Sequence, residues 1–428
     1  MGAVANTINI HLQAPELQYI LEHAESKIVV ASPDLLPLLQ EVWQLRGKTL
    51  PVAILNKGDE DLHFQQAPLS APTPPAEISP EDEAELLYTT GTTGRPKGVL
   101  LTHSNLLSEA QFIIEGHGLT ENDRSLCLLP FFHINGQVVN MVSGLLAGSS
   151  IILPRRFSAS AFWSTLAKHD ATWFNAVPTI YSILLNRPKE EMENLDLSQL
   201  QFGRSASAPL PVSVIEAFTE RFHVPTIETY GISETASQVT TNPRDPSKQK
   251  PGSAGKAQGC EVKIINKEGQ ELPQGQQGEI MVKGNNVMKS YYKNPEATAE
   301  AVTPDGWFHS GDLGYLDDDG FVFITGRIKE LIIRGGENIQ PREIDEVLYS
   351  HPKIQDAATV GVPDPLLGEE VKSFVVLKPG EKCSEEELLD YCRQHLAAFK
   401  CPKSIAFIQE MPKSPGGKII RRKLLESS

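Results

Sequence analysis

The stretch YTTGTTGRPKGV, residues 88–99, combines four threonines, three glycines and one lysine. Threonine hydroxyls and the backbone N–H groups of a glycine-rich turn can surround the oxygens of a polyphosphate. The common P-loop places a lysine directly after glycine and a Ser or Thr after that lysine, whereas Lys97 lies between Pro96 and Gly98. Pro96 also lacks the N–H group that such a cradle uses. The stretch therefore predicts a phosphate-binding turn of another type, with a Ser/Thr-rich surface turn as the alternative.

Length, charge and cysteine content narrow the class of protein. A chain of 428 residues is too long for one ordinary hydrophobic core, so we expect at least two domains. The net charge of −15 argues against a nucleic-acid-binding surface, although a small anionic substrate can still bind a locally basic site. The five cysteines form no CxxC pair, which favours reduced thiols in a cytoplasmic protein. The sequence shows no apolar run long enough for a transmembrane segment.

The pattern of apolar residues changes along the chain. Residues 1–56 alternate a helical piece with short apolar strands, and the proline-rich residues 65–80 predict a surface crossing. The α/β alternation then resumes, until residues 252–326 bring short strands joined by glycine turns. Within them DDDG, residues 317–320, favours a hairpin turn, because the ligand spacing of a calcium loop is missing. From residue 327 onward, helices and a strand predict a separate α+β unit.

Five further motifs follow the threonine loop. They are LPFFHINGQ (129–137), GRSASAPLP (203–211), TYGISETA (229–236), GWFHSGDLGYLDDDGFVFITGRIKELIIRGGENIQPREIDEVL (306–348) and KSPGGKIIRRKL (413–424). Together they resemble the adenylate-forming, AMP-binding superfamily of acyl-CoA synthetases, luciferases and carrier-protein adenylation domains. The resemblance implies a large α/β N-terminal domain, residues 1–326, with βα-layered sheets and a β-barrel-like part. A small, mobile α+β C-terminal domain, residues 327–428, would follow.

The same resemblance implies ATP, Mg²⁺ and coenzyme A (CoA) as ligands. ATP would convert a carboxylate into an acyl-AMP and pyrophosphate, and the thiol of CoA would then displace AMP. The β- and γ-phosphates would be held by Thr89, Thr90, Gly91, Thr92, Thr93, Gly94 and Lys97. Glu234 would coordinate Mg²⁺, a hard cation that prefers oxygen ligands, and Ser233 would contact the α-phosphate. The adenosine would be enclosed by Ser207, Ala208, Pro209, Tyr230 and Gly231, with Asp312 and Arg327 on its ribose.

Lys418 depends most on the resemblance for its interpretation. A lysine in GGK near a chain end is normally a solvated cation, but the equivalent lysine of the family enters the active site during adenylation and stabilises the transition state. Lys329 matches the hinge about which the small domain swings. Gly335 and Gly336 would approach the pantetheine arm of CoA. His133 would lie between the acyl pocket and the thiol tunnel, with a structural histidine as the alternative.

Two groups of relatives compete for the identity of the acid. GRIKELIIRGGENIQPREIDEVL, AVPTIYSILL and HLAAFKCPKSI resemble oxalate–CoA ligases, whereas LPFFHINGQ and RRFSASAFW resemble crotonobetaine/carnitine and fatty-acid CoA ligases. Asn135 and Gly94 stand where the oxalate group typically has histidine and serine, which weakens the dicarboxylate interpretation. We expect a small acid such as oxalate or a short-to-medium fatty acid, in a monomer or homodimer. Another acyl acceptor, a nucleotide-binding relic and a P-loop hydrolase are the alternatives.

The threonine loop lies closer to the N-terminus than in most of the family. The opening sequence GAVANTINIHLQAPELQYILEHAESKIVV resembles the second βα portion of the large domain. The resemblance therefore implies an N-terminally shortened fold that lacks the first strands and helices. A natural short form, a truncated gene model and an engineered chain all remain open.

Overall fold

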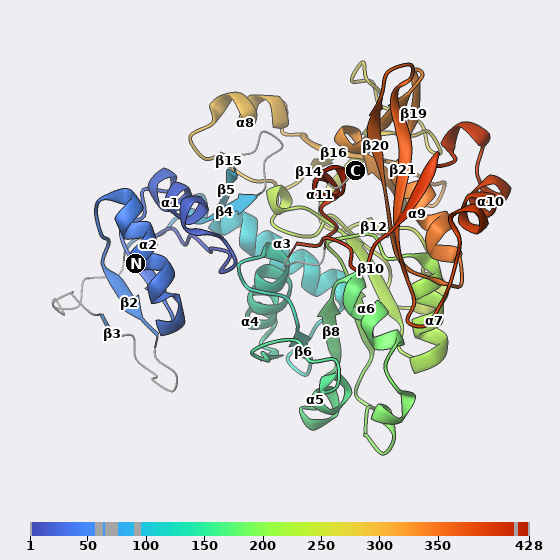
Figure 1. Cartoon of the computed structure of the whole chain (residues 1–428). Coiled ribbons are helices and arrows are strands. Elements are labelled where there is room, and N and C mark those ends of the chain that lie inside the picture. The colour runs from blue at the N-terminus through green and yellow to red at the C-terminus, as the bar shows by residue number, and fades with distance from the viewer. Residues whose placement is uncertain (1, 56–62, 65–75, 90–95, 415–417, 427–428) are drawn as a thin grey trace.

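The computed structural model describes residues 2–55, 63–64, 76–89, 96–414 and 418–426. Five sheets are found within these ranges. The first is a small sheet at one end of the molecule, on which two helices pack (Figure 1). Its elements are α1 (Ala14–His23), β1 (Val29–Ala31), α2 (Leu36–Arg46), β2 (Val52–Ile54) and β3 (His63–Phe64).

The largest sheet has seven strands in the order β12-β11-β10-β9-β8-β6-β7. Its parallel strands are β6 (Arg124–Cys127), β7 (Ser150–Ile152), β8 (Trp173–Ala176), β9 (Phe202–Ser205) and β10 (Thr226–Tyr230), and its antiparallel ones are β11 (Thr240–Thr241) and β12 (Lys256–Ala257). Its helices are α3 (His103–His117), α4 (Ser143–Ala147), α5 (Phe162–Lys168), α6 (Pro178–Leu185) and α7 (Val212–Phe222). In such sheets ligands bind beyond the carboxyl ends of the strands, where β9 and β10 lead into two of the motifs.

Two antiparallel sheets complete the larger part of the molecule. β4 (Glu83–Thr89) and β5 (Lys97–Thr102) pair with each other on either side of the threonine loop, and β15 (Ser290–Tyr291) joins β5. The other sheet contains β13 (Glu261–Ile265), β14 (Gly278–Lys283), β16 (Phe308–Leu316) and β17 (Val322–Arg327), and α8 (Pro295–Ala301) precedes β16. The DDDG segment is the turn between β16 and β17, so the predicted hairpin turn is confirmed.

The residues after β17 form a compact α+β unit at the opposite end from α1 (Figure 1). Its sheet contains β18 (Ile332–Arg334), β19 (Glu337–Ile339), β20 (Ile354–Asp364), β21 (Gly368–Leu377) and β22 (Ser404–Phe407). Its helices are α9 (Pro341–Ser350), α10 (Glu385–His395) and α11 (Arg421–Leu425). One face of the sheet packs on α9 and α10 through a core that includes Ile344, Leu348 and Leu388. The domain boundary at residues 326 and 327 stays a prediction.

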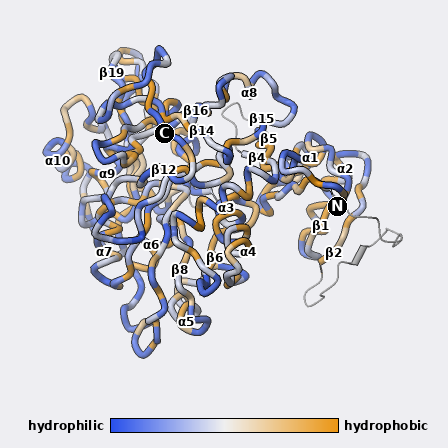
Figure 2. Tube along the Cα trace, turned by 180° about the vertical axis from the view of Figure 1, so that it is seen from behind, coloured by the Kyte–Doolittle hydropathy of each residue, from blue (hydrophilic) through white to orange (hydrophobic). Residues whose placement is uncertain are grey.

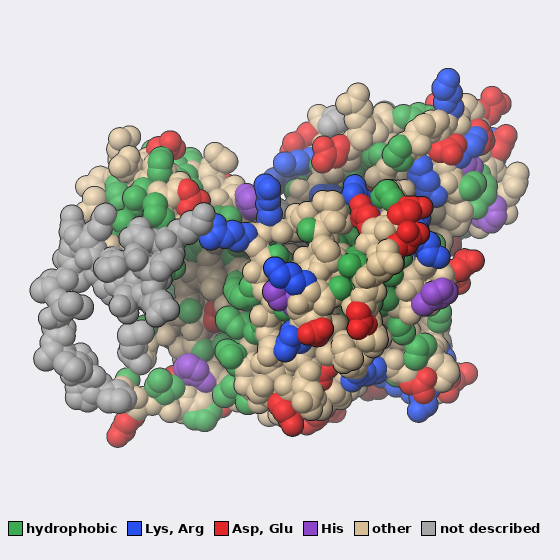
Figure 3. Space-filling model, turned by 90° about the horizontal axis from the view of Figure 1, so that it is seen from below, with side chains coloured by type: hydrophobic (Ala, Val, Ile, Leu, Met, Phe, Trp, Pro, Cys, Tyr) green, Lys and Arg blue, Asp and Glu red, His purple; other side chains and the backbone are tan. Residues whose placement is uncertain are grey.

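Hydrophobic segments run through the interior strands, whereas outer helices and turns are more hydrophilic (Figure 2). All four residues of β8 are buried, as expected for a parallel strand covered on both faces. On the face seen from below, acidic and basic side chains are interspersed (Figure 3). In the described part of the chain, every helix is too short or too polar to cross a membrane.

The predicted mixed α/β fold class is confirmed, but only some of the helices were predicted. The sequence pattern did not predict α2, α3, α4, α6, α8 and α11. A further unpredicted element, Asn135–Val142, is a π-helix that contains the end of the FFHINGQ motif. Extra residues in a helical turn are a feature of functional sites, and apolar periodicity gives no signal for them.

Candidate active site

A cavity of about 200 Å³ lies between the larger part of the molecule and the C-terminal unit. Its wall combines the carboxyl ends of β9 and β10, the β16–β17 pair, α9 and the segment before α11. Eight of the residues predicted from the motifs line it: Ser207, Ala208, Pro209, Tyr230, Gly231, Asp312, Arg327 and Lys418. Four motifs that are far apart in the sequence therefore meet at one cavity.

Asp312 is fixed from two sides. Its side chain is 2% exposed, and its Oδ2 accepts a hydrogen bond from the Tyr230 hydroxyl at 2.6 Å. Its Oδ1 lies 2.8 Å from Nε of Arg327. An ionised carboxylate has about four acceptor positions, so Asp312 can still accept bonds from two hydroxyl groups. Burial and the charge of Asp312 raise the pKa of Tyr230 well above its ordinary value, so the phenol remains a donor.

The backbone beside Tyr230 leaves no space for a larger residue. A Cβ atom added to Gly231 would lie 1.5 Å from the carbonyl oxygen of Ser237. Across the cavity, Ser207 adopts a left-handed conformation with φ of 73°, which non-glycine residues rarely adopt. The side chain of Asn135 donates a hydrogen bond of 3.0 Å to the Ser207 hydroxyl and supports this conformation. Two closely constrained backbone segments therefore face the cavity.

Lys418 reaches the cavity from the C-terminal segment. Its side chain is accessible to water in the open cavity, yet it is surrounded by protein groups. This partial burial and the positive charge of Arg327 lower the pKa of Lys418, while Glu330 and Asp312 act in the opposite direction. Lys418 and Arg327 thus lie close together in a cavity whose lining contains other basic and acidic side chains as well.

Five predicted residues of the threonine loop lie outside the described residues: Thr90, Gly91, Thr92, Thr93 and Gly94. Its two ends are Thr89 and Lys97, which are paired across the β4–β5 ladder.

Tyr291 connects Lys97 with Glu234. The Lys97 ammonium lies 4.8 Å from the centre of the Tyr291 ring, and the Tyr291 hydroxyl donates a 2.9 Å hydrogen bond to Oε1 of Glu234. Ser233 and Glu234 belong to a short 3₁₀ turn after β10. Glu234 is also near enough to Arg327 to raise the pKa of that guanidinium. Tyr291 is a residue that the motifs did not reveal.

Four other predicted residues do not line the cavity. Gly335 and Gly336 form the β18–β19 turn with φ of 59° and 89°, and Lys329 lies in the 3₁₀ turn Ile328–Glu330. His133 packs on Phe132, and burial lowers its pKa. Its Nε2 atom is buried without a hydrogen-bond partner among the described residues.

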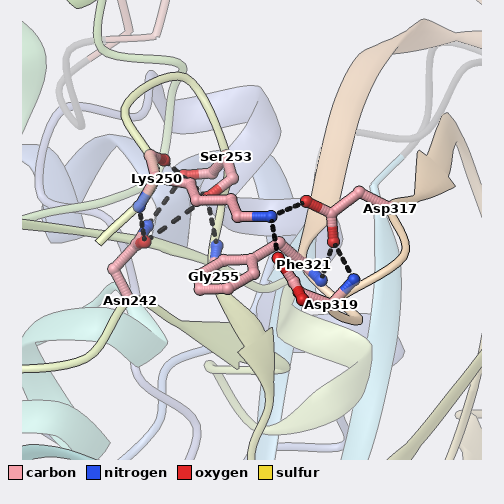
Figure 4. Close-up of polar contacts among 7 residues, drawn as sticks. All are labelled: Asn242, Lys250, Ser253, Gly255, Asp317, Asp319 and Phe321. Carbon is pink, nitrogen blue, oxygen red and sulfur yellow. Dashed lines mark hydrogen bonds and ion pairs between the residues drawn. The ribbon is translucent and has the colours of Figure 1, made fainter. Parts of the chain in front are cut away.

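Lys250 links its own loop to the β16–β17 turn (Figure 4). The Lys250 ammonium binds Asp317 and lies 2.6 Å from Oδ2 of Asp319, both in the β16–β17 turn. Nearby, the side chain of Asn242 donates a 2.8 Å hydrogen bond to the Ser253 carbonyl. Gly252 and Ala254 of this loop line the cavity. A lysine ammonium therefore occupies the acidic turn that superficially resembles a calcium loop.

A cluster of three residues whose side chains could bind a metal ion lies in the C-terminal unit. His351, Cys383 and Glu387 place ligand atoms within 4.8 Å of one another, but none of them lines the cavity. The Lys353 ammonium lies 2.6 Å from Oε1 of Glu387. This cluster is therefore stabilised by an ion pair in the C-terminal unit.

Comparison with known proteins agrees with this geometry. A family model described as AMP-binding enzyme matches residues 1–292, and one described as AMP-binding enzyme C-terminal domain matches residues 343–418. The sulfoacetate–CoA ligase of Cupriavidus necator is 44% identical over 99% of this chain and 82% of its own length. The oxalate–CoA ligase of Arabidopsis thaliana is 39% identical over 98% of this chain and 82% of its own. The crotonobetaine/carnitine–CoA ligase of Salmonella arizonae is 34% identical over 99% of this chain and 84% of its own length.

Solved structures show the same relationship. ATP-bound MatB from Rhodopseudomonas palustris is 32% identical with a TM-score of 0.87, over 98% of this chain and 82% of that one. MenE from Bacillus subtilis in complex with ATP and magnesium is 32% identical with a TM-score of 0.84, over 98% of this chain and 84% of that one. The chain therefore belongs to the family of AMP-binding enzymes. Its activity is that of an ATP-dependent, AMP-forming acid–CoA ligase, and both predicted groups of relatives are confirmed.

Proposed function

We propose that this ligase activates a small carboxylic acid that bears a second anionic group, and that the described cavity is its adenylation site. The observation that supports the site best is the meeting of Tyr230, Asp312, Arg327 and Lys418 at one cavity. Asp312 would accept bonds from both ribose hydroxyls, and Tyr230 with residues 207–209 would enclose adenine. Lys418 would bridge the substrate carboxylate and the α-phosphate, where negative charge develops in the transition state.

Mg²⁺ fits the neighbouring residues. Oε1 of Glu234 accepts the Tyr291 hydroxyl, and the second oxygen of this carboxylate remains for a cation. Mg²⁺ commonly uses one or two carboxylates together with phosphate oxygens and water. When bound, the ion would neutralise phosphate charge, while Lys97 and Thr89 would hold the departing pyrophosphate. Magnesium in the ATP complex of MenE supports the same proposal.

A buried arginine supports the second anionic group on the acid. Arg204 is 1% exposed, and its Nη1 donates a 2.9 Å hydrogen bond to Oδ1 of Asn135. Its other bonds in the described chain also go to neutral acceptors, which are His117, Asn175 and Gln238. Burial lowers the pKa of Arg204 to about 9, although the nearby buried carboxyl of Glu109 acts in the opposite direction, so the guanidinium is charged at neutral pH. Asn135 connects it to Ser207 at the cavity wall.

A fixed positive charge behind a pocket raises the local potential and favours anions. Sulfoacetate and oxalate, named for two of the relatives, are small acids of this kind. A short-to-medium fatty acid has no group that would use this charge, and it is the second candidate. The name of a third relative includes crotonobetaine. A small polar acid without a second anionic group is therefore a further substrate to test.

The second half-reaction would use a different arrangement of the C-terminal unit. Gly335 and Gly336 lie away from the cavity here, and Lys418 occupies it. We infer a rotation at Lys329 that withdraws Lys418 and brings the glycine turn to the CoA thiol, beside His133. A cytoplasmic location, a monomeric or homodimeric state and the stated domain boundary belong to the same proposal.

A panel of acids tests the proposal. Sulfoacetate, oxalate, malonate, butyrate and octanoate would each be supplied with ATP, Mg²⁺ and CoA, and pyrophosphate, AMP and thioester would be measured separately. We expect pyrophosphate and thioester from one or more of the doubly charged acids. Turnover of octanoate alone would contradict the substrate class, and ADP with orthophosphate as products would contradict the reaction.

Lys418→Ala tests the proposed site independently of the acid. We expect acid-dependent pyrophosphate formation to fall far more than thioester formation from a supplied acyl-adenylate. Equal losses in both half-reactions would contradict the role of Lys418. Absence of any turnover in a well-folded wild-type protein would favour the nucleotide-binding relic.

A further inference from the structure

Arg421, three residues after Lys418, makes three polar contacts at the start of α11. Its Nε lies 3.1 Å from Oε2 of Glu330, and its Nη2 lies 2.6 Å from Oδ2 of Asp345. Its Nη1 donates a 2.6 Å hydrogen bond to the carbonyl of Thr359. The guanidinium thus joins the C-terminal segment to the residues after β17, to α9 and to β20.

All three partners follow Lys329 in the sequence. Glu330 is the next residue, so the ion pair begins directly after the predicted hinge. A rotation at Lys329 would therefore move Arg421 and its partners as one body. The path from the hinge to Lys418 is short: it runs from Glu330 through the Arg421 side chain and three residues of backbone.

The charge of Arg421 is maintained by its surroundings. Burial alone would lower the pKa of Arg421, but Asp345 and Glu330 raise it above its ordinary value. The Arg421 side chain is 20% exposed and that of Asp345 8%, so this pair is largely shielded from water, whereas the Glu330 side chain is 35% exposed. Loss of one partner of a buried ion pair leaves the other charge without compensation.

The chain before Lys418 is also fixed to its surroundings. Lys413 binds Asp356, and the Ser414 amide donates a 2.7 Å hydrogen bond to the Lys418 carbonyl. After the turn, the Leu424 side chain is buried in the small-unit core. Arg421 supplies charged contacts between Lys418 and this core.

We propose that Arg421, through Glu330 and Asp345, is a positioning residue that fixes Lys418 relative to the hinge for the adenylation half-reaction. The inference rests on the proposed role of Lys418. Arg421, Glu330 and Asp345 themselves line the cavity, and the role proposed for Arg421 is to set the place from which the lysine reaches it. A displacement of about 1 Å in a catalytic group can cost about a hundredfold in rate.

The test compares Arg421→Ala, Arg421→Lys and Glu330→Gln with Arg422→Ala as the matched control. Arg422 is the next residue, with a side chain 76% exposed and an ion pair to Glu426 at 3.8 Å. We expect Arg421→Ala to lower acid-dependent pyrophosphate formation by about a hundredfold and to leave thioester formation from acyl-adenylate unchanged. Arg421→Lys keeps the charge but loses the planar fork, so its loss should be intermediate. Arg422→Ala should match the wild type.

A double-mutant cycle separates positioning from general damage. If Arg421 acts through Lys418, Arg421→Ala should cause no further loss of pyrophosphate formation in a Lys418→Ala background. Multiplied losses would overturn the proposal, as would equal losses in both half-reactions of a folded Arg421→Ala protein. If Arg421→Ala does not fold, the near-isosteric variant Glu330→Gln provides the test. Wild-type pyrophosphate formation by Glu330→Gln would overturn the proposal. Failure of the wild type to form pyrophosphate would instead contradict the proposed function.

Discussion

Neighbouring atoms restrict which residue can occupy several positions around the cavity. Gly231 is required because the Ser237 carbonyl occupies the space of a Cβ atom. The Glu228 side chain is buried beside α9, where Arg342 and Glu346 are close enough to influence its pKa. Both residues line the cavity, and each supports a prediction that concerns one position only.

Gly231→Ala should reduce adenylation strongly. The added methyl group would force the backbone beside Tyr230 to move by an ångström or so, which can cost about a hundredfold in rate. The measurement is acid-dependent pyrophosphate release at varied ATP concentration. Gly144→Ala is the control, because its new methyl group would meet only side-chain atoms, at 3.2 Å or more. A Gly231→Ala enzyme with wild-type kcat/KM for ATP would contradict the proposed adenine site.

Glu228→Gln should change how stability depends on pH. Burial raises the pKa of Glu228 from 4.5 to about 7, although Arg342 opposes this shift. The folded protein therefore binds this proton more tightly than the unfolded chain does. The contribution of Glu228 to the free energy of unfolding should fall as the pH rises from about 4.5 to about 7, and then stay constant. Urea unfolding across this range should show a smaller fall for the variant, and an unchanged slope would refute the assignment.

At the scale of elements, long-range contacts decide the positions that local sequence leaves open. The β16–β17 turn takes its cation from Lys250, which lies before β13. The DDDG sequence alone favoured a hairpin turn but could not reveal this lysine. Since the loop around Lys250 lines the cavity at Gly252 and Ala254, the contact links a turn to the candidate site.

Lys250→Met should destabilise the β16–β17 turn. Removal of the ammonium leaves Asp317 and Asp319 without their shared cation, so the free energy of unfolding should fall. Urea unfolding measures the change, and Asp319→Asn in the same chain should recover part of it. Lys248→Met is the matched control, because its side chain is 72% exposed. Thermal stabilisation of the wild type by Ca²⁺ would contradict the role of Lys250.

The sequence could predict most of this architecture because its motifs lie at strand ends. TYGISETA begins with the last two residues of a buried strand, and the structure places it at the carboxyl end of β10. The cavity contacts of Glu228, Arg342 and Glu330 could not be predicted, since they arise where α9 and β17 approach the large sheet. Tyr291 was missed for the same reason, because its contact with Glu234 crosses from β15 to the turn after β10.

At the scale of the whole molecule, the cavity lies where the larger part of the molecule meets the C-terminal unit. Residues of both the large sheet and the C-terminal unit line it. A site divided in this way can be assembled or opened by moving one part, provided that a few residues absorb the rotation. Lys329 follows β17 directly after Ile328, where the chain leaves one sheet for the next.

Lys329→Pro tests the proposed rotation. Proline fixes φ near −65°, a value compatible with a 3₁₀ turn but not with free rotation of the backbone. We expect pyrophosphate formation to be retained and thioester formation to fall strongly. Lys329→Ala should retain both half-reactions, since it restricts the backbone little. Equal retention of both half-reactions in Lys329→Pro would show that the hinge lies elsewhere.

The positive charge next to Lys418 has a thermodynamic consequence for nucleotide binding. Burial and Arg327 both disfavour the protonated lysine before ATP arrives. The triphosphate would supply the missing counter-charge, so the lysine should take up a proton as the complex forms. At a pH where Lys418 of the free enzyme is partly deprotonated, the heat of ATP binding should then vary with the ionisation enthalpy of the buffer. ATP would act as the electrostatic partner that keeps the C-terminal unit closed, and loss of pyrophosphate would remove much of that attraction before the thiol reacts.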